Sequence, residues 1–515
     1  MDRQKKQMEE SLAVRLQAYS QSDHYPLHMP GHKRRAYGQL PEDVVQLDIT
    51  EIDGFDNLHH AEGILKKLQE HAACLYGAEE TFYLVNGSTS GILSAVSAAV
   101  PEGGHILIAR NCHKSVYHAC YLRNLTISYL YPQVMQAYDI CEPITCEQVE
   151  DALRHDTDID AVLVVSPTYE GRIADIESIA RVVHAKGIPL IVDEAHGAHL
   201  GFVEGFAENS CRQGADLVIH SVHKTLPAMT QTALLHVNGS LIDRKQLKRF
   251  LHIYQSSSPS YVLMASIDNA LRQVNERRIE LFGDFIHNWN GMCRDLSTMK
   301  NLSILKPEKK QDIGKLLVSV KKTGLSGQQL YDMLLQEYHL QLEMAATTYV
   351  LAMFTVGDSA EGYERMTQAL LEIDKRLTQA FRTQIDERSS QTLRTDVDER
   401  VAQADVGEAG EPSGKEAWHQ VEFAERNVGI PFYKAWDMET EYCRLSLCQG
   451  RSAGEFMNLY PPGIPMIVPG EQIDEELMRQ ISDCLQKGLS VQGVRQVDGE
   501  IYLPVLLRSQ EMCGR

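Results

Sequence analysis

Short apolar runs alternate with amphipathic stretches along the first half of the chain. Six runs are rich in apolar residues without alternation, at residues 81–85, 105–109, 161–165, 188–192, 217–219 and 233–237. Stretches with helical spacing lie between them, at residues 62–76, 89–100, 115–122 and 176–185. Strands without alternation are typical of burial on both faces, and strands separated by helices indicate βαβ units. The pattern therefore predicts an α/β fold with a mostly parallel sheet, whose ligands bind at the carboxyl ends of its strands.

The pattern changes in the second half of the chain. A long helix is expected over 261–282, and the segments 315–322, 328–337 and 361–379 suggest a smaller α/β domain. No aromatic residue occurs between Phe381 and Trp418, and this charge-rich stretch resembles a solvated linker. We therefore expect five parts: an N-terminal arm and interface segment (1–61), a large domain (62–305), a small domain (306–383), an acidic linker or insertion (384–416) and a C-terminal domain (417–515).

Composition and charge exclude several classes of protein. The 515 residues include 50 basic and 70 acidic side chains, a net charge of −20. This balance argues against binding to nucleic acid or to an anionic membrane surface. No run approaches roughly 18 apolar residues, and the charged N-terminus lacks the apolar region of a signal peptide. The 11 cysteines contain no Cys-x-x-Cys pair, which favours reduced thiols and a cytoplasmic location.

The segment 86–91 (NGSTSG) follows a predicted strand and opens a predicted helix. Free amides at a helix N-terminus, together with the hydroxyls of Ser88, Thr89 and Ser90, would form a cradle for a phosphate group. The alternative is an ordinary helix cap with turn glycines. The segment matches neither a Walker loop nor a dinucleotide fingerprint.

Two charged residues follow later strands. Asp193 follows the apolar run 188–192, where its carboxylate could meet a cationic partner such as a protonated ring nitrogen. A metal site formed by Asp193, His196 and His199, or a helix cap, is the competing interpretation. Lys224 follows the run 217–219 within the segment 221–225 (SVHKT). A lysine in this position is a candidate for a lowered pKa and a Schiff-base amine, although most lysines lie at the surface.

His113 also follows a strand, and its imidazole could stack on a planar ligand or act as an acid. A single histidine in a loop is more often ordinary polar surface. The combination is more specific than any one residue. A phosphate cradle, a stacking ring, a partner for a pyridinium nitrogen and a Schiff-base lysine are the groups that pyridoxal phosphate requires.

The chain resembles the ornithine/lysine/arginine decarboxylases, which are pyridoxal-phosphate enzymes with the aspartate-aminotransferase fold. The resemblance is carried, in the family's order, by the segments 28–33 (HMPGHK), 48–51 (DITE), 54–59 (GFDNLH), 86–91, 111–115 (NCHKS), 166–169 (SPTY), 193–199 (DEAHGAH), 221–225 and 460–465 (YPPGIP). Only 27 residues precede the first segment. The chain is therefore similar to the shorter form found in Gram-positive bacteria, which lacks a receiver-like N-terminal domain.

The resemblance implies a role for each matching residue. Lys224 would form the Schiff base, Asp193 would pair with the pyridine nitrogen, and His113 would stack on the ring. Ala195 would pack on the other face of the ring. The residues expected near the phosphate are Ser88, Thr89, Ser90, Ser221 and His223. His196 is expected near the phenolic oxygen of the cofactor.

The implied activity is the decarboxylation of lysine, arginine or ornithine to the corresponding amine and CO₂, with pyridoxal 5′-phosphate as cofactor and no metal. Alternatives are another reaction on the same fold, such as that of an aminotransferase or aldolase, or a non-enzymatic protein that binds a phosphate ligand. The sequence does not select one of the three amino acids. Glu343 and Glu471 are candidates for an acidic contact with the substrate. The family segments within residues 21–60 further imply a homodimer or larger homo-oligomer, with the active site at the subunit boundary.

Overall fold

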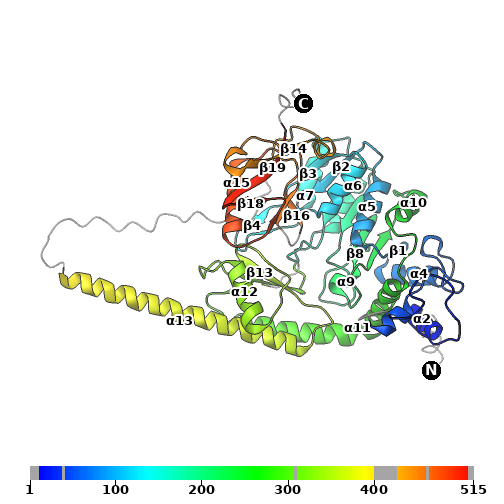
Figure 1. Cartoon of the computed structure of the whole chain (residues 1–515), viewed down its shortest axis with the longest axis horizontal. Coiled ribbons are helices and arrows are strands. Elements are labelled where there is room, and N and C mark those ends of the chain that lie inside the picture. Colours follow the sequence, from blue (N-terminus) through cyan, green and yellow to red (C-terminus); the bar gives the residue numbers. More distant parts are fainter. Residues whose placement is uncertain (1–10, 37–40, 307–309, 399–425, 460–462, 508–515) are drawn as a thin grey trace.

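The computed structural model describes residues 11–36, 41–306, 310–398, 426–459 and 463–507, with the backbone alone described over 384–398. Figure 1 shows these parts in colour. The N-terminal helix is described from Leu12 to Ser20 (α2). No helix within these ranges combines the length and the apolar character needed to cross a lipid bilayer.

The large domain is built on a seven-stranded sheet. In spatial order its strands are β1 (Glu80–Leu84), β9 (Ala233–Val237), β8 (Leu217–Ser221), β7 (Leu190–Asp193), β6 (Ala161–Val165), β2 (His105–Ala109) and β3 (Thr126–Leu130). β9 runs antiparallel to both of its neighbours, and every other neighbouring pair is parallel. The predicted α/β fold with a mostly parallel sheet is thereby confirmed.

The sheet is buried on both faces, which explains its uninterrupted apolar strands. In β6, Val162 and Val164 belong to one hydrophobic cluster, whereas Ala161 and Leu163 belong to another on the opposite face. Helices cover both faces of the sheet. The helices in this part of the chain are α3 (Glu42–Leu47), α4 (Ile64–Tyr76), α5 (Gly87–Ala99), α6 (Lys114–Leu122), α7 (Cys146–His155), α8 (Ile176–His184), α9 (Val222–Thr225) and α10 (Arg244–Tyr254), with a 3₁₀ turn at Leu58–His60.

The helix α11 (Tyr261–Leu296) connects two hydrophobic cores and is longer than the predicted 261–282. Phe282 belongs to the core of the large domain, whereas Phe285 and Trp289 belong to the next core. The apolar side of the helix therefore continues beyond the expected end. The helix changes direction near Arg277, whose φ of −117° is not helical.

The second core lies between α11 and a four-stranded antiparallel sheet. The sheet contains β10 (Ser303–Ile304), β11 (Lys315–Ser319), β13 (Tyr349–Met353) and β12 (Met344–Ala345), and it packs with α12 (Gly327–Tyr338) and α13 (Ala360–Asp398). Figure 1 shows α13 extending away from the rest of the molecule. The predicted linker 384–416 begins inside this helix, and its residues 399–416 lie outside the described ranges.

The C-terminal part contains two small sheets. One has the order β14 (Thr440–Arg444), β19 (Glu500–Leu506), β18 (Arg495–Val497), and the other has the order β16 (Ile464–Ile467), β15 (Met457–Leu459), β17 (Val491–Gln492). The C-terminal part also contains α14 (Phe432–Ala435), α15 (Glu475–Gln486) and a 3₁₀ turn at Leu445–Leu447. Elsewhere, in the first half of the chain, β4 (Val134–Met135) and β5 (Ile140–Cys141) form a short hairpin.

A buried ion pair joins the C-terminal part to the large domain. Arg110 Nη2 lies 2.9 Å from Glu471 Oε2, and both side chains are almost fully buried. Arg110 also donates to the carbonyl oxygen of Pro465 at 2.8 Å. These contacts hold the segment after residue 463 against the carboxyl end of β2. The four borders between the five parts expected from the sequence stay predictions.

Candidate active site

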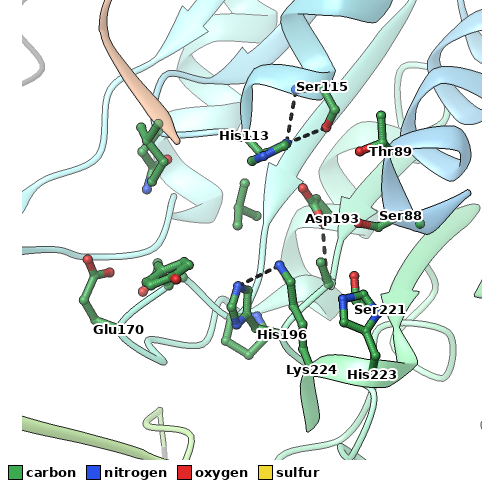
Figure 2. Close-up of a pocket in the computed structure, with 18 of the residues that line it drawn as sticks. Ser88, Thr89, His113, Ser115, Glu170, Asp193, His196, Ser221, His223 and Lys224 are labelled. Carbon is green, nitrogen blue, oxygen red and sulfur yellow. Dashed lines mark hydrogen bonds between the residues drawn. The ribbon is translucent and has the colours of Figure 1, made fainter. Parts of the chain in front are cut away.

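A cavity of about 360 Å³ opens at the carboxyl ends of the parallel strands. This is the edge at which sheets of this type bind their ligands. Figure 2 shows side chains from several strand-following loops that point toward this space. The residues expected at the site that line the cavity are Ser88, Thr89, His113, Asp193, Ala195, His196, Ser221, His223 and Lys224.

One end of the cavity is formed by the first turn of α5. Gly87 has a φ of +72°, a left-handed conformation that glycine adopts easily, and the Asn86 side chain makes no cap hydrogen bond with the helix. The amides of a first turn lack partners within the helix, so this end can bind an anion. Ser88 and Thr89 line the cavity here. Ser90 does not, because its buried hydroxyl donates to the Gly87 carbonyl oxygen at 2.9 Å.

Ser221 and His223 lie on the same side of the cavity as Ser88 (Figure 2). The Ser221 hydroxyl is fully buried and has no hydrogen-bond partner among the described residues. His223 Nδ1 lies 2.9 Å from the Thr232 carbonyl oxygen, so this nitrogen carries a hydrogen and donates it. A buried hydroxyl without a partner beside an uncapped helix is an arrangement that a phosphate group would complete.

Asp193 is the last residue of β7, and its carboxylate is buried at the cavity wall. Burial raises the pKa of Asp193, and the positive charge of Lys224 acts in the opposite direction. Asp193 Oδ1 accepts a hydrogen bond from the Ala195 amide at 3.2 Å. A buried carboxylate in this position stabilises a cation placed in the cavity.

Lys224 lies in the short helix α9, directly after β8. Burial lowers the pKa of Lys224, while the charges of Asp193 and Glu343 partly oppose this effect. Its Nζ lies 3.0 Å from His196 Nε2, a contact that is drawn in Figure 2. A lysine with a lowered pKa spends more time as the neutral amine, which is the nucleophilic form.

His113 precedes α6, and its ring is neutral. Its Nδ1 accepts a hydrogen bond from the Ser115 amide at 3.2 Å, so the hydrogen of the neutral ring is on Nε2. Burial lowers the pKa of His113 to about 4, and the charges of Lys224 and Lys114 act in the same direction. Ala195 also lines the cavity. These two side chains can flank a planar ligand without adding a charge.

Sequence reasoning missed an acidic and aromatic group at the other end of the cavity. Tyr169 and Glu170 line it, and the Glu170 carboxylate accepts a hydrogen bond from the Tyr349 hydroxyl at 3.0 Å. The Tyr169 hydroxyl donates to Glu343, one of the two acids predicted from the sequence. The other, Glu471, pairs with Arg110 instead. Glu170 directly follows the family segment 166–169, and this position could have identified it as a candidate site residue.

A second buried lysine was also missed. Lys315 belongs to β11 of the small domain, and its Nζ lies 2.9 Å from His196 Nδ1. His196 therefore lies between two lysine amines. The metal interpretation is not supported, because His199 Nε2 instead lies 2.9 Å from Asp312 Oδ1. Within the described ranges, no group of three or more His, Cys, Asp or Glu side chains is arranged to hold a metal ion.

The fold and the cavity define an α/β enzyme with a lysine at its centre. The chain matches the sequence profile of the major domain of Orn/Lys/Arg decarboxylases over residues 11–337, and that of their C-terminal domain over residues 427–487. It therefore belongs to the Orn/Lys/Arg decarboxylase family and is a pyridoxal-phosphate-dependent decarboxylase of basic amino acids.

Comparison with individual proteins agrees with this assignment. An arginine decarboxylase of Bacillus subtilis is 29% identical over 98% of this chain and 99% of its own length. The Bacillus subtilis protein YaaO is 32% identical over 92% of this chain and 94% of its own. Among solved structures, the lysine decarboxylase LdcF of Francisella novicida has a TM-score of 0.77 and 17% identity, over 97% of this chain and 81% of its own. This last likeness concerns the fold.

Proposed function

We propose that the chain decarboxylates arginine, using pyridoxal phosphate held in the cavity around Lys224. The observation that carries the proposal is the pair of oppositely charged side chains, buried Asp193 and partly buried Lys224, at adjacent strand ends of one cavity. At the other end, Glu170 lines the cavity, and the exposed Glu343 accepts a hydrogen bond from Tyr169, which also lines it. The cavity thus offers a reactive amine, a partner for a ring cation and a separate acidic end.

The residues present fit the cofactor. The uncapped start of α5 and the buried Ser221 hydroxyl suit its phosphate group. The Asp193 carboxylate suits a protonated pyridine nitrogen, and neutral His113 and small Ala195 would flank the ring. When bound, pyridoxal phosphate supplies an electron sink for the electron pair that remains at Cα after CO₂ departs.

The protein's own residues control charge and protons in this reaction. Asp193 keeps a proton on the ring nitrogen, because a nearby carboxylate raises the pKa of that nitrogen. The low pKa of Lys224 provides a neutral amine that can exchange with the α-amino group of the substrate. In its protonated form, the Lys224 amine would supply the proton that Cα requires after the carboxyl group leaves.

The acidic end of the cavity accounts for a cationic side chain in the substrate. Burial raises the pKa of Glu170, and a cation bound beside this carboxyl would lower that pKa and favour the carboxylate. A guanidinium group is planar and donates in several directions, which suits two separate carboxylates better than one. Bacillus proteins named arginine decarboxylase match nearly the whole chain, in agreement with this choice.

Amine formation from arginine, lysine and ornithine tests the substrate. We expect arginine to have the highest kcat/KM, with release of CO₂ and without formation of a keto acid. Borohydride reduction of the loaded enzyme, followed by peptide mapping, should place the cofactor on Lys224. A label on another lysine would refute the site, and a preference for lysine would refute the substrate alone.

The substitution Glu170→Gln tests the acidic end. A hydrogen bond to a charged group contributes about 1.5–3 kcal/mol, so kcat/KM for arginine should fall roughly 10- to 100-fold, mostly through KM. Glu150→Gln, on the exposed side of α7, is the matched control. An unchanged KM in the Glu170 variant would exclude this residue from substrate binding.

We also propose that the active form is a homodimer. The segment around residues 25–29 exposes Tyr25, Leu27 and Met29 by 75%, 86% and 63%. A second copy that covers this segment would remove the apolar surface from water. A fully active monomer in sedimentation experiments would contradict this proposal.

The ten cysteines of the described ranges are free, and on this basis we propose a cytoplasmic location.

A further inference from the structure

Lys315 is a buried lysine without a role in the proposed reaction. Its side chain reaches from β11 of the small domain to His196 in the wall of the cavity, and Lys315 itself is 2% exposed. Its Nζ lies 2.9 Å from His196 Nδ1, while Lys224 Nζ lies 3.0 Å from His196 Nε2. One imidazole thus bridges the reactive lysine and a second lysine.

The hydrogens of this group can be counted. A neutral imidazole has one N–H, which donates, and one nitrogen lone pair, which accepts. A lysine ammonium group can only donate, so the N–H of His196 requires a neutral amine as acceptor. Burial lowers the pKa of His196 well below its ordinary value, and the charges of Lys224 and Lys315 act in the same direction, so the neutral ring is favoured. Both contacts can therefore exist together only when at least one of the two lysines is neutral.

We propose that Lys224 and Lys315 share one positive charge through His196, and that Lys315 is a positioning residue that sets the protonation of the reactive amine. When Lys315 carries the charge, it donates to His196 Nδ1, and His196 Nε2–H donates to neutral Lys224. When Lys224 carries the charge, both hydrogen bonds reverse. The two arrangements differ by a proton shift along two hydrogen bonds, and the total charge stays the same.

Other titratable groups face this bridge from several elements. Those that influence the pKa of one or more of its members are Asp193, Glu343, Glu170, Asp312, His113 and His199. Several of the carboxyls are engaged elsewhere, since Asp312 pairs with His199 and Glu343 accepts from Tyr169. Burial lowers the pKa of Lys315 to about 8 and also lowers that of Lys224. This agrees with two amines that hold less than two charges.

The shared charge suits the reaction, because decarboxylation consumes one proton at Cα in each turnover. A proton given up by Lys224 can be replaced from Lys315 through His196, without a path for water to the reacting carbon. The inference rests on Lys224 as the reactive lysine of the proposed function. Its test, however, uses the full chain freed of cofactor and does not depend on decarboxylation.

The test measures the fraction of neutral Lys224 as a function of pH. Trace acetic anhydride acetylates neutral amines, and mass spectrometry of the Lys224 peptide gives the rate at each pH. In Lys315→Arg the neighbour is permanently charged, so Lys224 should become neutral at a lower pH than in the wild type. In Lys315→Met the neighbour has no charge, and the midpoint should lie above that of the wild type. We expect the two variants to differ by about one pH unit or more.

The order of the three midpoints decides the outcome. A structural role for Lys315 predicts shifts in one direction or none, whereas charge sharing places the wild type between the two variants. If the wild type coincides with either variant, the charge is not shared and the proposal is overturned. Lys321→Met is the matched control, because Lys321 follows the same strand and pairs with Asp139 at 2.7 Å, away from His196; its Lys224 midpoint should equal that of the wild type. If Lys315→Arg does not fold, the Lys315→Met midpoint decides alone, and a wild-type value overturns the proposal.

Discussion

Asp193 and Glu194 are consecutive acids at the end of one strand, and both are buried, yet their surroundings differ. Asp193 lines the cavity and accepts a hydrogen bond from the Ala195 amide. Glu194 lies on the other side of the chain, where Ser210 donates to it from its hydroxyl at 2.7 Å and from its amide. Burial raises the pKa of both acids. A raised pKa therefore does not separate a functional acid from a structural one. The hydrogen-bond partners do: Asp193 faces the cavity and can accept a ligand, whereas both oxygens of Glu194 are bonded to other protein groups.

Glu194 begins a linear chain of buried hydrogen bonds that ends at Thr81. Its Oε2 lies 2.7 Å from His220 Nε2, His220 Nδ1 lies 3.0 Å from His236 Nε2, and His236 Nδ1 lies 2.7 Å from Thr81 Oγ1. Burial raises the pKa of Glu194 to about 8 and lowers that of His220 to about 3. At neutral pH the carboxyl thus keeps its proton and donates it to His220, and each histidine donates to the next member of the chain.

Replacing each acid by its amide should give the largest difference in activity between the two positions. Asp193→Asn keeps the shape but removes the charge that would hold a proton on the ring nitrogen. We expect kcat to fall by about 10²–10³, or roughly 3–4 kcal/mol, while the protein still binds cofactor. The measurement is CO₂ release beside the visible absorption of the bound cofactor, with Glu194→Gln as the matched control. Activity within threefold of the wild type would show that Asp193 does not support the electron sink.

Glu194→Ala should affect stability rather than chemistry. The change leaves the Ser210 donors and the end of the histidine chain without a partner. Each buried unpaired group costs about 1–3 kcal/mol, so we expect the free energy of unfolding to fall by roughly 2–4 kcal/mol. Urea unfolding measures this loss, and the activity per folded molecule should stay near that of the wild type. A stable but inactive variant would place Glu194 in the reaction.

The same two acids show what sequence could and could not predict. Strands 105–109, 161–165 and 233–237 agree with the structure at both ends, because apolar runs buried on two faces have sharp limits. Asp193 and Lys224 could be placed together because both follow strands at one edge of a parallel sheet. No local sequence pattern shows that Asp193 faces the cavity while Glu194 is hydrogen-bonded within the protein.

The sequence also could not predict which residues of the small domain contact the residues that line the cavity. Lys315 and Glu343 come from the small domain and contact His196 and Tyr169, two residues that line the cavity. Ser90 carries a hydroxyl, as Ser88 and Thr89 do, but this hydroxyl is buried and donates to the Gly87 carbonyl oxygen. Helical geometry at the first turn, rather than composition, decides which of the three hydroxyls lines the cavity.

Thr81→Val tests the far end of the chain of hydrogen bonds. Valine has the shape of threonine but cannot accept the hydrogen bond from His236, so one buried N–H loses its partner. We expect a loss of about 1–3 kcal/mol in the free energy of unfolding, with unchanged kcat and KM. Thr81→Ser keeps the hydroxyl and should lose clearly less. Equal losses in the two variants would show that the methyl group, not the hydrogen bond, matters at this position.

The smallest expected effect is the most specific, and it concerns pH. The Glu194 pKa of about 8 lies above the ordinary value near 4.5, so the folded protein binds more protons than the unfolded chain between these values. Stability therefore falls as pH rises through this window and, above pH 8, no longer depends on this group. The neutral histidines act in the opposite direction, but only below the ordinary histidine pKa near 6.5. Between pH 7 and 8 the effect of Glu194 remains.

Glu194→Gln removes this pH dependence without breaking the chain. The glutamine amide can donate to His220 and accept from Ser210, as the protonated carboxyl does, and it does not titrate. We expect the stability of the variant to fall less steeply than that of the wild type between pH 7 and 8, by about 1 kcal/mol, in urea unfolding of the loaded enzyme. Parallel pH profiles would mean that Glu194 is already ionised at neutral pH. The histidine chain would then run in the reverse direction, with Thr81 as its first donor, and the contrast with Asp193 would rest on geometry alone.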